Sequence, residues 1–165
     1  MNNLCDKKIT VLGGGKSGIA VSKLAASIGA KVFLSDKNKF SHNFKKYKNN
    51  ITIEMGNHSN KCYDCELVII SPGISTNNQF INSFNNKKIP IISEIEFASW
   101  YTESPIIGIT GSNGKSTTVK ILESILIKKY KNTLLGGNIG IPFSQNVLYE
   151  KENELTNAIH ILELS

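Results

Sequence analysis

Short apolar runs alternate along the chain with stretches in which apolar residues recur about every three or four positions. The compact runs are typical of buried strands, and the periodic stretches are typical of helices. The runs predict strands at 9–12, 31–35, 51–54, 67–70, 89–92, 106–110, 133–135 and 158–164. The periodic stretches predict helices at 18–28, 41–48, 79–84, 94–101 and 115–128. In the last of these, one apolar stripe is formed by Thr118, Ile121, Leu122, Ile125 and Leu126.

Fully apolar strands that alternate with helices indicate an α/β fold with parallel sheets covered on both faces. The pattern restarts near residues 92–94, so we expect one unit at 1–93 and a second at 94–165. The second unit has about 70 residues, and its last predicted strand runs into the chain end. A doubly wound domain is normally larger and continues past each strand, so we expect this unit to be incomplete.

The first glycine motif, Gly13-Gly14-Gly15-Lys16-Ser17-Gly18, follows a strand and opens a helix. This context fits G-x-G-x-x-G and predicts a Rossmann-like unit that holds a pyrophosphate at the helix N-terminus. Asp36 ends the second strand, where such a fold places its ribose-binding acid. Ser71-Pro72-Gly73 follows another strand, on the side of the sheet where ligands bind. The competing interpretation is that both are ordinary turns that bind nothing.

The second motif comes between the apolar strand at 106–110 and the helix at 115–128. Its residues are Gly111, Ser112, Asn113, Gly114, Lys115, Ser116 and Thr117. They form a variant P-loop, because Ile109 stands where the usual first glycine would fall. Lys115 then offers its charge to the phosphates of ATP, and the Ser116 hydroxyl is suited to Mg²⁺. Glu163, at the end of the last strand, is the candidate acid beside the metal; the alternative is a solvent-facing carboxylate.

Composition and charge limit the kinds of partner that we expect this chain to bind. The chain has 165 residues and a formal charge of +6, and every basic residue is lysine. The lysines form no dense stripe, and no arginine is present to read bases, so we expect no nucleic-acid partner. No apolar run approaches the ~20 residues of a membrane span, and no signal peptide is evident, so we expect a cytoplasmic protein.

The three cysteines are Cys5, Cys62 and Cys65, an odd number that argues against a disulfide framework. Cys62 and Cys65 have the spacing of metal ligands, but a zinc site needs four. Only His58 and the distant Cys5 could complete it, so reduced structural thiols are favoured.

Six motifs together resemble the Mur ligase family, and the resemblance covers essentially the whole chain. The motifs, in the order found in that family, are Gly13 to Gly18, Ser71-Pro72-Gly73, Ser93-Glu94-Ile95-Glu96, Gly111 to Thr117, Gly136-Gly-Asn-Ile-Gly140 and Glu163-Leu-Ser165. Within the family, the D-glutamate-adding ligases are the most similar.

The resemblance implies an enzyme of peptidoglycan precursor synthesis that uses ATP and Mg²⁺. Its substrates would be UDP-N-acetylmuramoyl-L-alanine and D-glutamate, joined through an acyl phosphate, with no obligate protein partner. Carried over by position, the substrate-binding residues would be Lys16, Ser17, Asp36, Lys37, Ser71, Pro72, Gly73 and Asn138. The 111–117 loop would hold ATP, with Lys115 catalytic, and Ser116 and Glu163 would bind Mg²⁺.

The resemblance also implies what this sequence does not contain. The family continues with a metal-binding histidine, a carbamylated lysine and a C-terminal domain, so we expect no ligase activity from these 165 residues alone. Three other interpretations stay open. The first glycine loop and Asp36 also fit an NAD-dependent oxidoreductase, which leaves Lys115 and Ser116 unexplained. A P-loop ATPase or binding module is the second. The third is a sister ligase, either one that adds another amino acid or a folyl-polyglutamate synthase.

Overall fold

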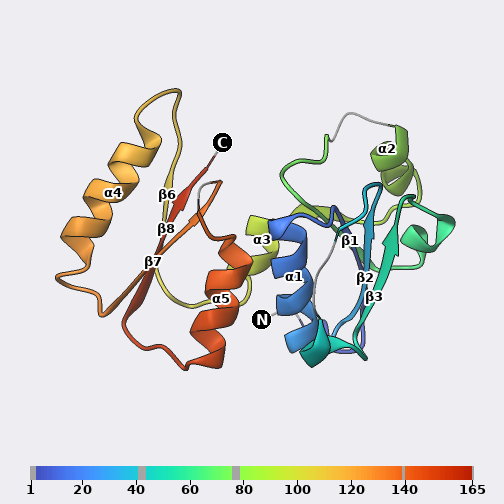
Figure 1. Cartoon of the computed structure of the whole chain (residues 1–165), viewed down its shortest axis with the longest axis horizontal. Coiled ribbons are helices and arrows are strands. Elements are labelled where there is room, and N and C mark those ends of the chain that lie inside the picture. Colours follow the sequence, from blue (N-terminus) through green and yellow to red (C-terminus); the bar gives the residue numbers. More distant parts are fainter. Residues whose placement is uncertain (1–2, 41–43, 76–78, 139, 165) are drawn as a thin grey trace.

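Two parallel sheets make up the chain, as the strand pattern predicts. A computed structural model describes residues 3–40, 44–75, 79–138 and 140–164 (Figure 1). The first sheet has the order β3-β2-β1-β4-β5. Its strands are β1 (Lys8–Leu12), β2 (Lys31–Asp36), β3 (Ile51–Met55), β4 (Leu67–Ile70) and β5 (Ile91–Ser93). The second has the order β6-β8-β7. Its strands are β6 (Ile106–Ile109), β7 (Asn132–Gly137) and β8 (Ala158–Glu163).

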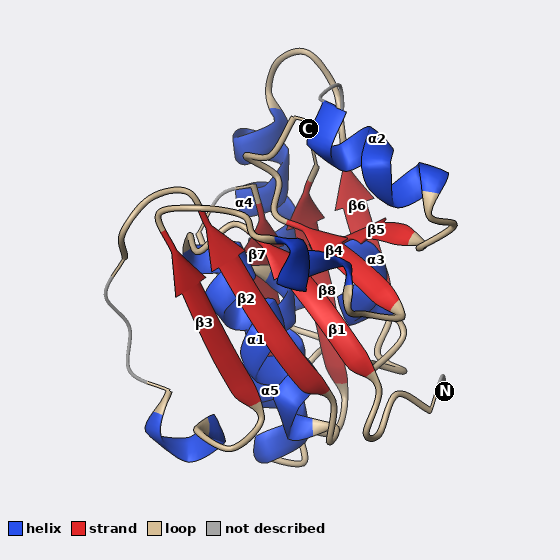
Figure 2. Cartoon of the chain, turned by 90° about the vertical axis from the view of Figure 1, so that its right-hand side faces the viewer, coloured by secondary structure: helices blue, strands red, loops and turns tan. Residues whose placement is uncertain are grey.

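Five α-helices and two short 3₁₀ helices accompany the sheets in the described residues, and three of the α-helices lie between the sheets. The α-helices are α1 (Lys16–Ser27), α2 (Gln79–Asn86), α3 (Glu94–Ser99), α4 (Lys115–Leu126) and α5 (Phe143–Glu152). Two short 3₁₀ helices are η1 (Lys45–Tyr47) and η2 (Asn60–Tyr63). Helix α5 of the second half packs against α1 and α3 of the first half, and these three helices separate the sheets (Figures 1 and 2).

One hydrophobic core runs through both halves. It starts at β1 and α1, with Val11 and Leu24 fully buried, and continues through Phe97 of α3 into Phe143 and Val147 of α5. Burying a side chain of this size stabilises the fold by about 1.5–3 kcal/mol. Because this core is shared, the loops at the carboxyl ends of the two sheets are held in a fixed relation.

The structure corrects three expectations. The prediction of a helix at 41–48 is wrong over 44–48, where only the three residues of η1 are helical. Residues 41–43 of that prediction lie outside the described residues. Helix α5 was not predicted at all. The apolar stripe at 115–128 is on a real helix, but Ile121 and Ile125 are 54% and 57% exposed. Within α4, Val119 is the buried residue that the structure gives. The periodicity of a sequence shows that a helix has an apolar face, but it does not show whether another element packs against that face.

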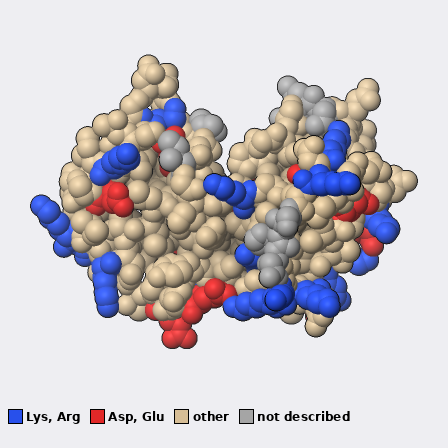
Figure 3. Space-filling model, viewed as in Figure 1, with Lys and Arg blue, Asp and Glu red and all other residues tan. Residues whose placement is uncertain are grey.

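In the part of the chain that the structure describes, no helix has the length and apolar character needed to span a bilayer. On the face shown in Figure 3, lysines are spread over both halves, with acidic residues between them. The three cysteines are free thiols, and burial raises the pKa of Cys62 and of Cys65.

Candidate functional site

The loop between β1 and α1 is shaped by its glycines. Gly13 has a φ of +97°, a left-handed conformation that most side chains disfavour. A Cβ on Gly18 would lie 1.7 Å from the Gly13 carbonyl oxygen, so α1 approaches β1 only because residue 18 has no side chain. A Cβ on Gly15 would meet nothing within 4 Å. The backbone at Gly15 is therefore open to a ligand at the start of α1, where helix N–H groups favour an anion.

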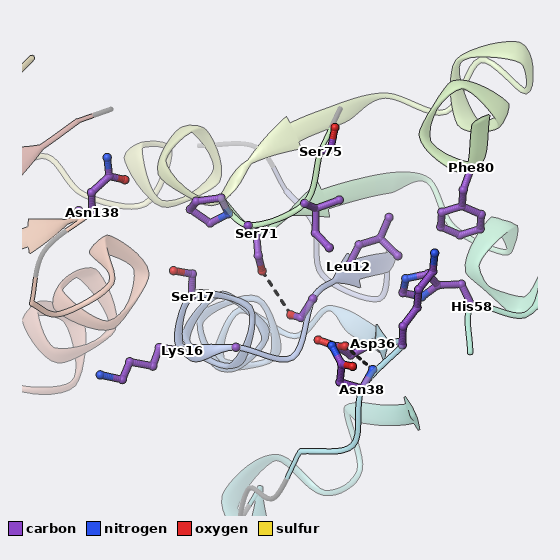
Figure 4. A pocket seen from close by; sticks show the side chains of 17 residues that line it. Leu12, Lys16, Ser17, Asp36, Asn38, His58, Ser71, Ser75, Phe80 and Asn138 are labelled. Atoms are coloured by element: carbon purple, nitrogen blue, oxygen red, sulfur yellow. Dashed lines mark hydrogen bonds between the residues drawn. The ribbon is translucent and has the colours of Figure 1, made fainter. Parts of the chain in front are cut away.

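Asp36 joins this loop to the end of β2. Its Oδ2 accepts a hydrogen bond from the Gly14 amide at 2.5 Å, and its Oδ1 accepts one from the Asn38 amide at 2.7 Å. On the other side of the loop, the Ser71 hydroxyl after β4 donates to the Gly13 carbonyl at 3.2 Å (Figure 4). These contacts fix the loops after β1, β2 and β4 beside one another, at the edge where parallel sheets bind ligands.

A pocket of about 560 Å³ opens between these loops. It is lined by Leu12, Gly13, Gly15, Lys16, Ser17, Asp36, Lys37, Asn38, His58, Ser71, Pro72, Gly73, Ile74, Ser75, Phe80, Gly137 and Asn138. The structure thus brings all eight residues expected to bind the UDP substrate to one pocket. Sequence reasoning missed the rings of His58 and Phe80 there, because neither lies in a phosphate-binding motif.

The pocket has two chemically different ends (Figure 4). Asn138, from the loop after β7, lies at one end, and the start of α1 with Lys16 and Ser17 lies next to it. His58 and Phe80 lie at the other end. An anion held at the start of α1 would have a polar amide on one side and an aromatic wall on the other.

The second glycine loop connects β6 to α4. Gly111 has a φ of +144° and Gly114 a φ of +76°, which lets the chain turn tightly into the helix that begins at Lys115. The Lys115 ammonium lies across this loop and donates to the Gly111 carbonyl at 2.5 Å. Next to it, the Ser116 hydroxyl donates to Oε2 of Glu163 at 2.8 Å. Glu163 ends β8 and is 6% exposed, so it is a buried acid beside the loop rather than a solvent-facing one.

A short chain of contacts links the pocket to the second loop. The backbone N–H of Asn138 donates to the backbone carbonyl oxygen of Glu163 at 2.8 Å. The side-chain carboxylate of Glu163 accepts a hydrogen bond from the Ser116 hydroxyl. Gly137 pairs with Glu163 across β7 and β8, and a Cβ on Gly137 would lie 2.2 Å from that carbonyl. The pocket and the second glycine loop therefore meet at the carboxyl ends of β7 and β8.

Among the described residues, no group of three or more His, Cys, Asp or Glu side chains could hold a metal ion. The Ser116 hydroxyl and the Glu163 carboxylate still fit Mg²⁺, because this ion takes few protein oxygens and completes its shell with phosphates and water. The loop at 111–117 fits a triphosphate in the same way, since it combines a helix N-terminus with a lysine ammonium.

The buried His160 lies apart from this chemistry. Its Nε2 is 2.8 Å from Glu150 of α5, a carboxylate that also accepts from the hydroxyls of Thr102 and Ser104. Burial alone would raise the pKa of Glu150, but these hydrogen bonds lower it overall. The cluster ties the segment before β6 to α5.

Comparisons with known proteins agree with this geometry. Residues 8–80 match the model of the MurD N-terminal domain. The chain is 41% identical over 162 residues to the UDP-N-acetylmuramoylalanine–D-glutamate ligase of Christiangramia forsetii, with 96% of this chain and 35% of that protein covered. It is 42% identical over 159 residues to the ligase of the same name from Elusimicrobium minutum, with 90% and 34% covered.

The chain is also similar to solved structures of two other peptide ligases. A pseudomurein peptide ligase type C from Methanothermus fervidus matches with a TM-score of 0.54 and 25% identity, over 96% of this chain and 33% of that one. The murein peptide ligase mpl from Psychrobacter arcticus matches with a TM-score of 0.59 over 95% and 37%. At 20% identity, the latter likeness concerns the fold alone.

The fold, the two glycine loops and these similarities relate the chain to the Mur ligase family. Within that family its similarity is to the D-glutamate ligases, and residues 8–80 correspond to the MurD N-terminal domain. The chain spans about a third of the length of these curated relatives.

Proposed function

We propose that this chain provides the UDP-substrate pocket and the phosphate loop of an ATP-dependent ligase that adds D-glutamate to UDP-N-acetylmuramoyl-L-alanine. The observation that carries the proposal is the continuous path from the pocket, through Asn138 and Glu163, to Ser116 of the second loop. A substrate held in this pocket would extend toward the place where ATP is expected to bind.

In this proposal, the diphosphate of the substrate lies against the backbone at the start of α1, near Lys16 and Ser17. The positive charge of Lys16 and the free N–H groups at the start of α1 favour the diphosphate there. Asp36 and Lys37 border the uridine end, and the 71–73 loop closes the pocket. Asn138 orients the part of the substrate that carries the carboxylate, because it lies at the end of the pocket nearest Glu163.

The 111–117 loop would hold ATP, and Ser116 with Glu163 would hold Mg²⁺. When bound, ATP supplies the phosphoryl group that gives the substrate carboxylate a leaving group as an acyl phosphate, ready for attack by the amine of D-glutamate. Lys115 lowers the cost of bringing two anions together, since its ammonium is fixed beside the loop.

We also propose that residues 1–93 act as the UDP-substrate domain and residues 94–165 as the first part of the ATP-binding domain. The sheets support this division, because the first ends at Ser93 and the second begins at Ile106. The shared core explains how the two parts keep one pocket between them.

Isothermal titration of the chain with UDP-N-acetylmuramoyl-L-alanine and with NADH tests the proposal. We expect saturable binding of the UDP compound and none of NADH. Lys16→Ala should weaken binding by about tenfold, the size of one charge-assisted contact. Lys23→Ala, on the same helix but outside the pocket, is the matched control and should leave the affinity unchanged. Binding of NADH alone would favour the oxidoreductase interpretation, and binding of ATP alone would favour a P-loop ATPase or binding module.

A further inference from the structure

Helix α5 begins without a side-chain cap from its own segment. Its N-cap residue is Pro142, whose ring cannot accept a hydrogen bond from the first turn of the helix. The amides of Gln145 and Asn146 donate to the Pro142 carbonyl oxygen. Ser144 is fully buried, so its amide needs an acceptor from another part of the chain.

Glu94 of the first half supplies that acceptor. It follows the end of β5 and belongs to the Ser93-to-Glu96 motif, to which the proposed function assigns no role. The Glu94 side chain is buried, and its Oε1 accepts a hydrogen bond from the Ser144 amide at 2.5 Å. Helices α3 and α5 pack against each other (Figure 1), so a residue of one half holds the start of a helix in the other.

The start of α5 also holds the turn that carries Asn138. The Gly137 amide donates to the carbonyl oxygen of Ile141, just before the helix, at 3.2 Å. In the first turn of α5, the Asn146 side chain donates to the Leu135 carbonyl oxygen of β7 at 2.7 Å. A movement at the start of α5 would therefore also move Asn138.

The two halves contribute unequally to the pocket. Its lining residues come from the first half, except for Gly137 and Asn138. A ligand that stays on the loops after β1, β2 and β4 therefore needs only the first half. A ligand that reaches from those loops to Asn138 also needs the two halves in the correct relative position. Glu94 acts at this junction, because it follows β5 at the carboxyl edge of the first sheet, where the pocket opens.

We infer that Glu94 is a positioning residue: by holding the start of α5, it sets the position of Asn138 relative to the loops of the first half. The inference rests on the proposed function, in which the diphosphate occupies the start of α1 and the sugar acid extends toward Asn138. UDP alone contacts only the first half, so its affinity does not depend on Glu94. The affinity for UDP-N-acetylmuramoyl-L-alanine, which spans both halves, does.

Calorimetric titration with UDP and with UDP-N-acetylmuramoyl-L-alanine tests this inference. We expect the unchanged chain to bind the larger ligand more tightly. Glu94→Ala should weaken binding of the larger ligand by about tenfold, the effect of roughly one hydrogen bond, and leave UDP binding within about twofold. Glu94→Gln keeps an accepting oxygen and should restore the affinity. A chain that was merely destabilised would lose both ligands together.

Glu152→Ala is the matched control, because Glu152 also joins α5 to the first half, but at the other end of the helix. Its carboxylate accepts from the Tyr47 hydroxyl at 3.0 Å and pairs with the Lys46 ammonium, and it does not line the substrate pocket. We expect this variant to keep the preference for the larger ligand. Asn138→Ala tests the route, since Glu94→Ala should have no further effect in a chain that already carries it.

Circular dichroism checks that each variant is folded. If Glu94→Ala does not fold, Glu94→Asp replaces it, because the shorter side chain withdraws the oxygen from the Ser144 amide; we expect a smaller loss in the same direction. The inference would be overturned, and the proposed function left standing, by equal affinity of the unchanged chain for both ligands or by an unchanged preference in the folded Glu94 variant. An equal loss in Glu152→Ala, or a loss that persists beside Asn138→Ala, would have the same meaning. Failure of the unchanged chain to bind either ligand would overturn both.

Discussion

Glu94 allows a quantitative test of how the two halves are joined. This residue begins α3 and is 2% exposed, and its Oε1 accepts a hydrogen bond from the Ser144 amide in the first turn of α5 at 2.5 Å. Glu94→Ala leaves that buried amide without its acceptor, at a cost of about 1–3 kcal/mol. It also removes a buried methylene worth about 0.8 kcal/mol. We expect the free energy of unfolding to fall by about 2–4 kcal/mol near pH 5.

Glu94→Gln separates the hydrogen bond from the charge. Burial raises the pKa of Glu94, although the hydrogen bonds from Ser144 act in the opposite direction. The folded state therefore binds this proton more tightly than the unfolded chain does. The resulting stabilisation is complete below the ordinary glutamate pKa and is lost as pH rises through the raised value. Glutamine keeps an accepting oxygen and cannot ionise, so this variant should match the unchanged chain at low pH and exceed it at high pH.

Urea unfolding followed by circular dichroism measures the effects of both Glu94 substitutions on the free energy of unfolding. The measurements run from about pH 4.5 to about pH 8.5, which spans about four units above the ordinary carboxyl pKa. Glu103→Gln, at an exposed position before β6, is the matched control and should change little at any pH. If Glu94→Gln destabilised the chain as much as Glu94→Ala at every pH, the ionised carboxylate itself would be stabilising. The account of a buried neutral acid joining α3 to α5 would then be wrong.

Three further substitutions test other parts of the structure. Gly18→Ala places a methyl group against the Gly13 carbonyl, so we expect lower thermal stability and loss of UDP binding in calorimetry, and unchanged binding would contradict the packing of α1 on its loop. In a complete ligase that carries this chain, Lys115→Ala should lower turnover by about 10²–10³-fold, and unchanged turnover would remove Lys115 from its role. Glu150→Gln weakens the hydrogen bonds to a carboxylate whose pKa is lowered in the folded state. The unchanged chain should therefore be more stable than this variant above about pH 4.5, and this difference in stability should be lost as pH falls through the lowered pKa. Urea unfolding at several pH values measures the difference, and a difference that grew toward low pH would contradict the prediction.

The strands and four of the helices could be predicted from sequence, because each leaves a local signal. Apolar runs identify all the strands, and glycine loops mark the starts of α1 and α4. Helix α5 leaves a weak signal, since its buried face includes the polar Ser144 and Asn146. The Asn146 side chain is buried because it donates to the Leu135 carbonyl at 2.7 Å, a contact that only the folded chain creates.

The residues of the candidate site also fall into two groups, those that local sequence motifs predict and those that only the folded chain brings together. Phosphate-binding loops have fixed spacing in sequence, so the residues of both glycine loops could be named beforehand. His58 could not, because its place in the pocket depends on the stacking of Phe80, 22 residues later, and on Ser35 in a neighbouring strand. The link from Asn138 to Glu163 likewise depends on the register of β7 and β8.

Backbone amide chemical shifts test most directly whether the two loops serve one cleft. UDP-N-acetylmuramoyl-L-alanine should shift the amides of Lys16, Ser17 and Asn138. A non-hydrolysable ATP analogue with Mg²⁺, added next, should shift Lys115 and Ser116 and move Asn138 again. Two sets of shifted amides that do not meet at Asn138 would contradict the account.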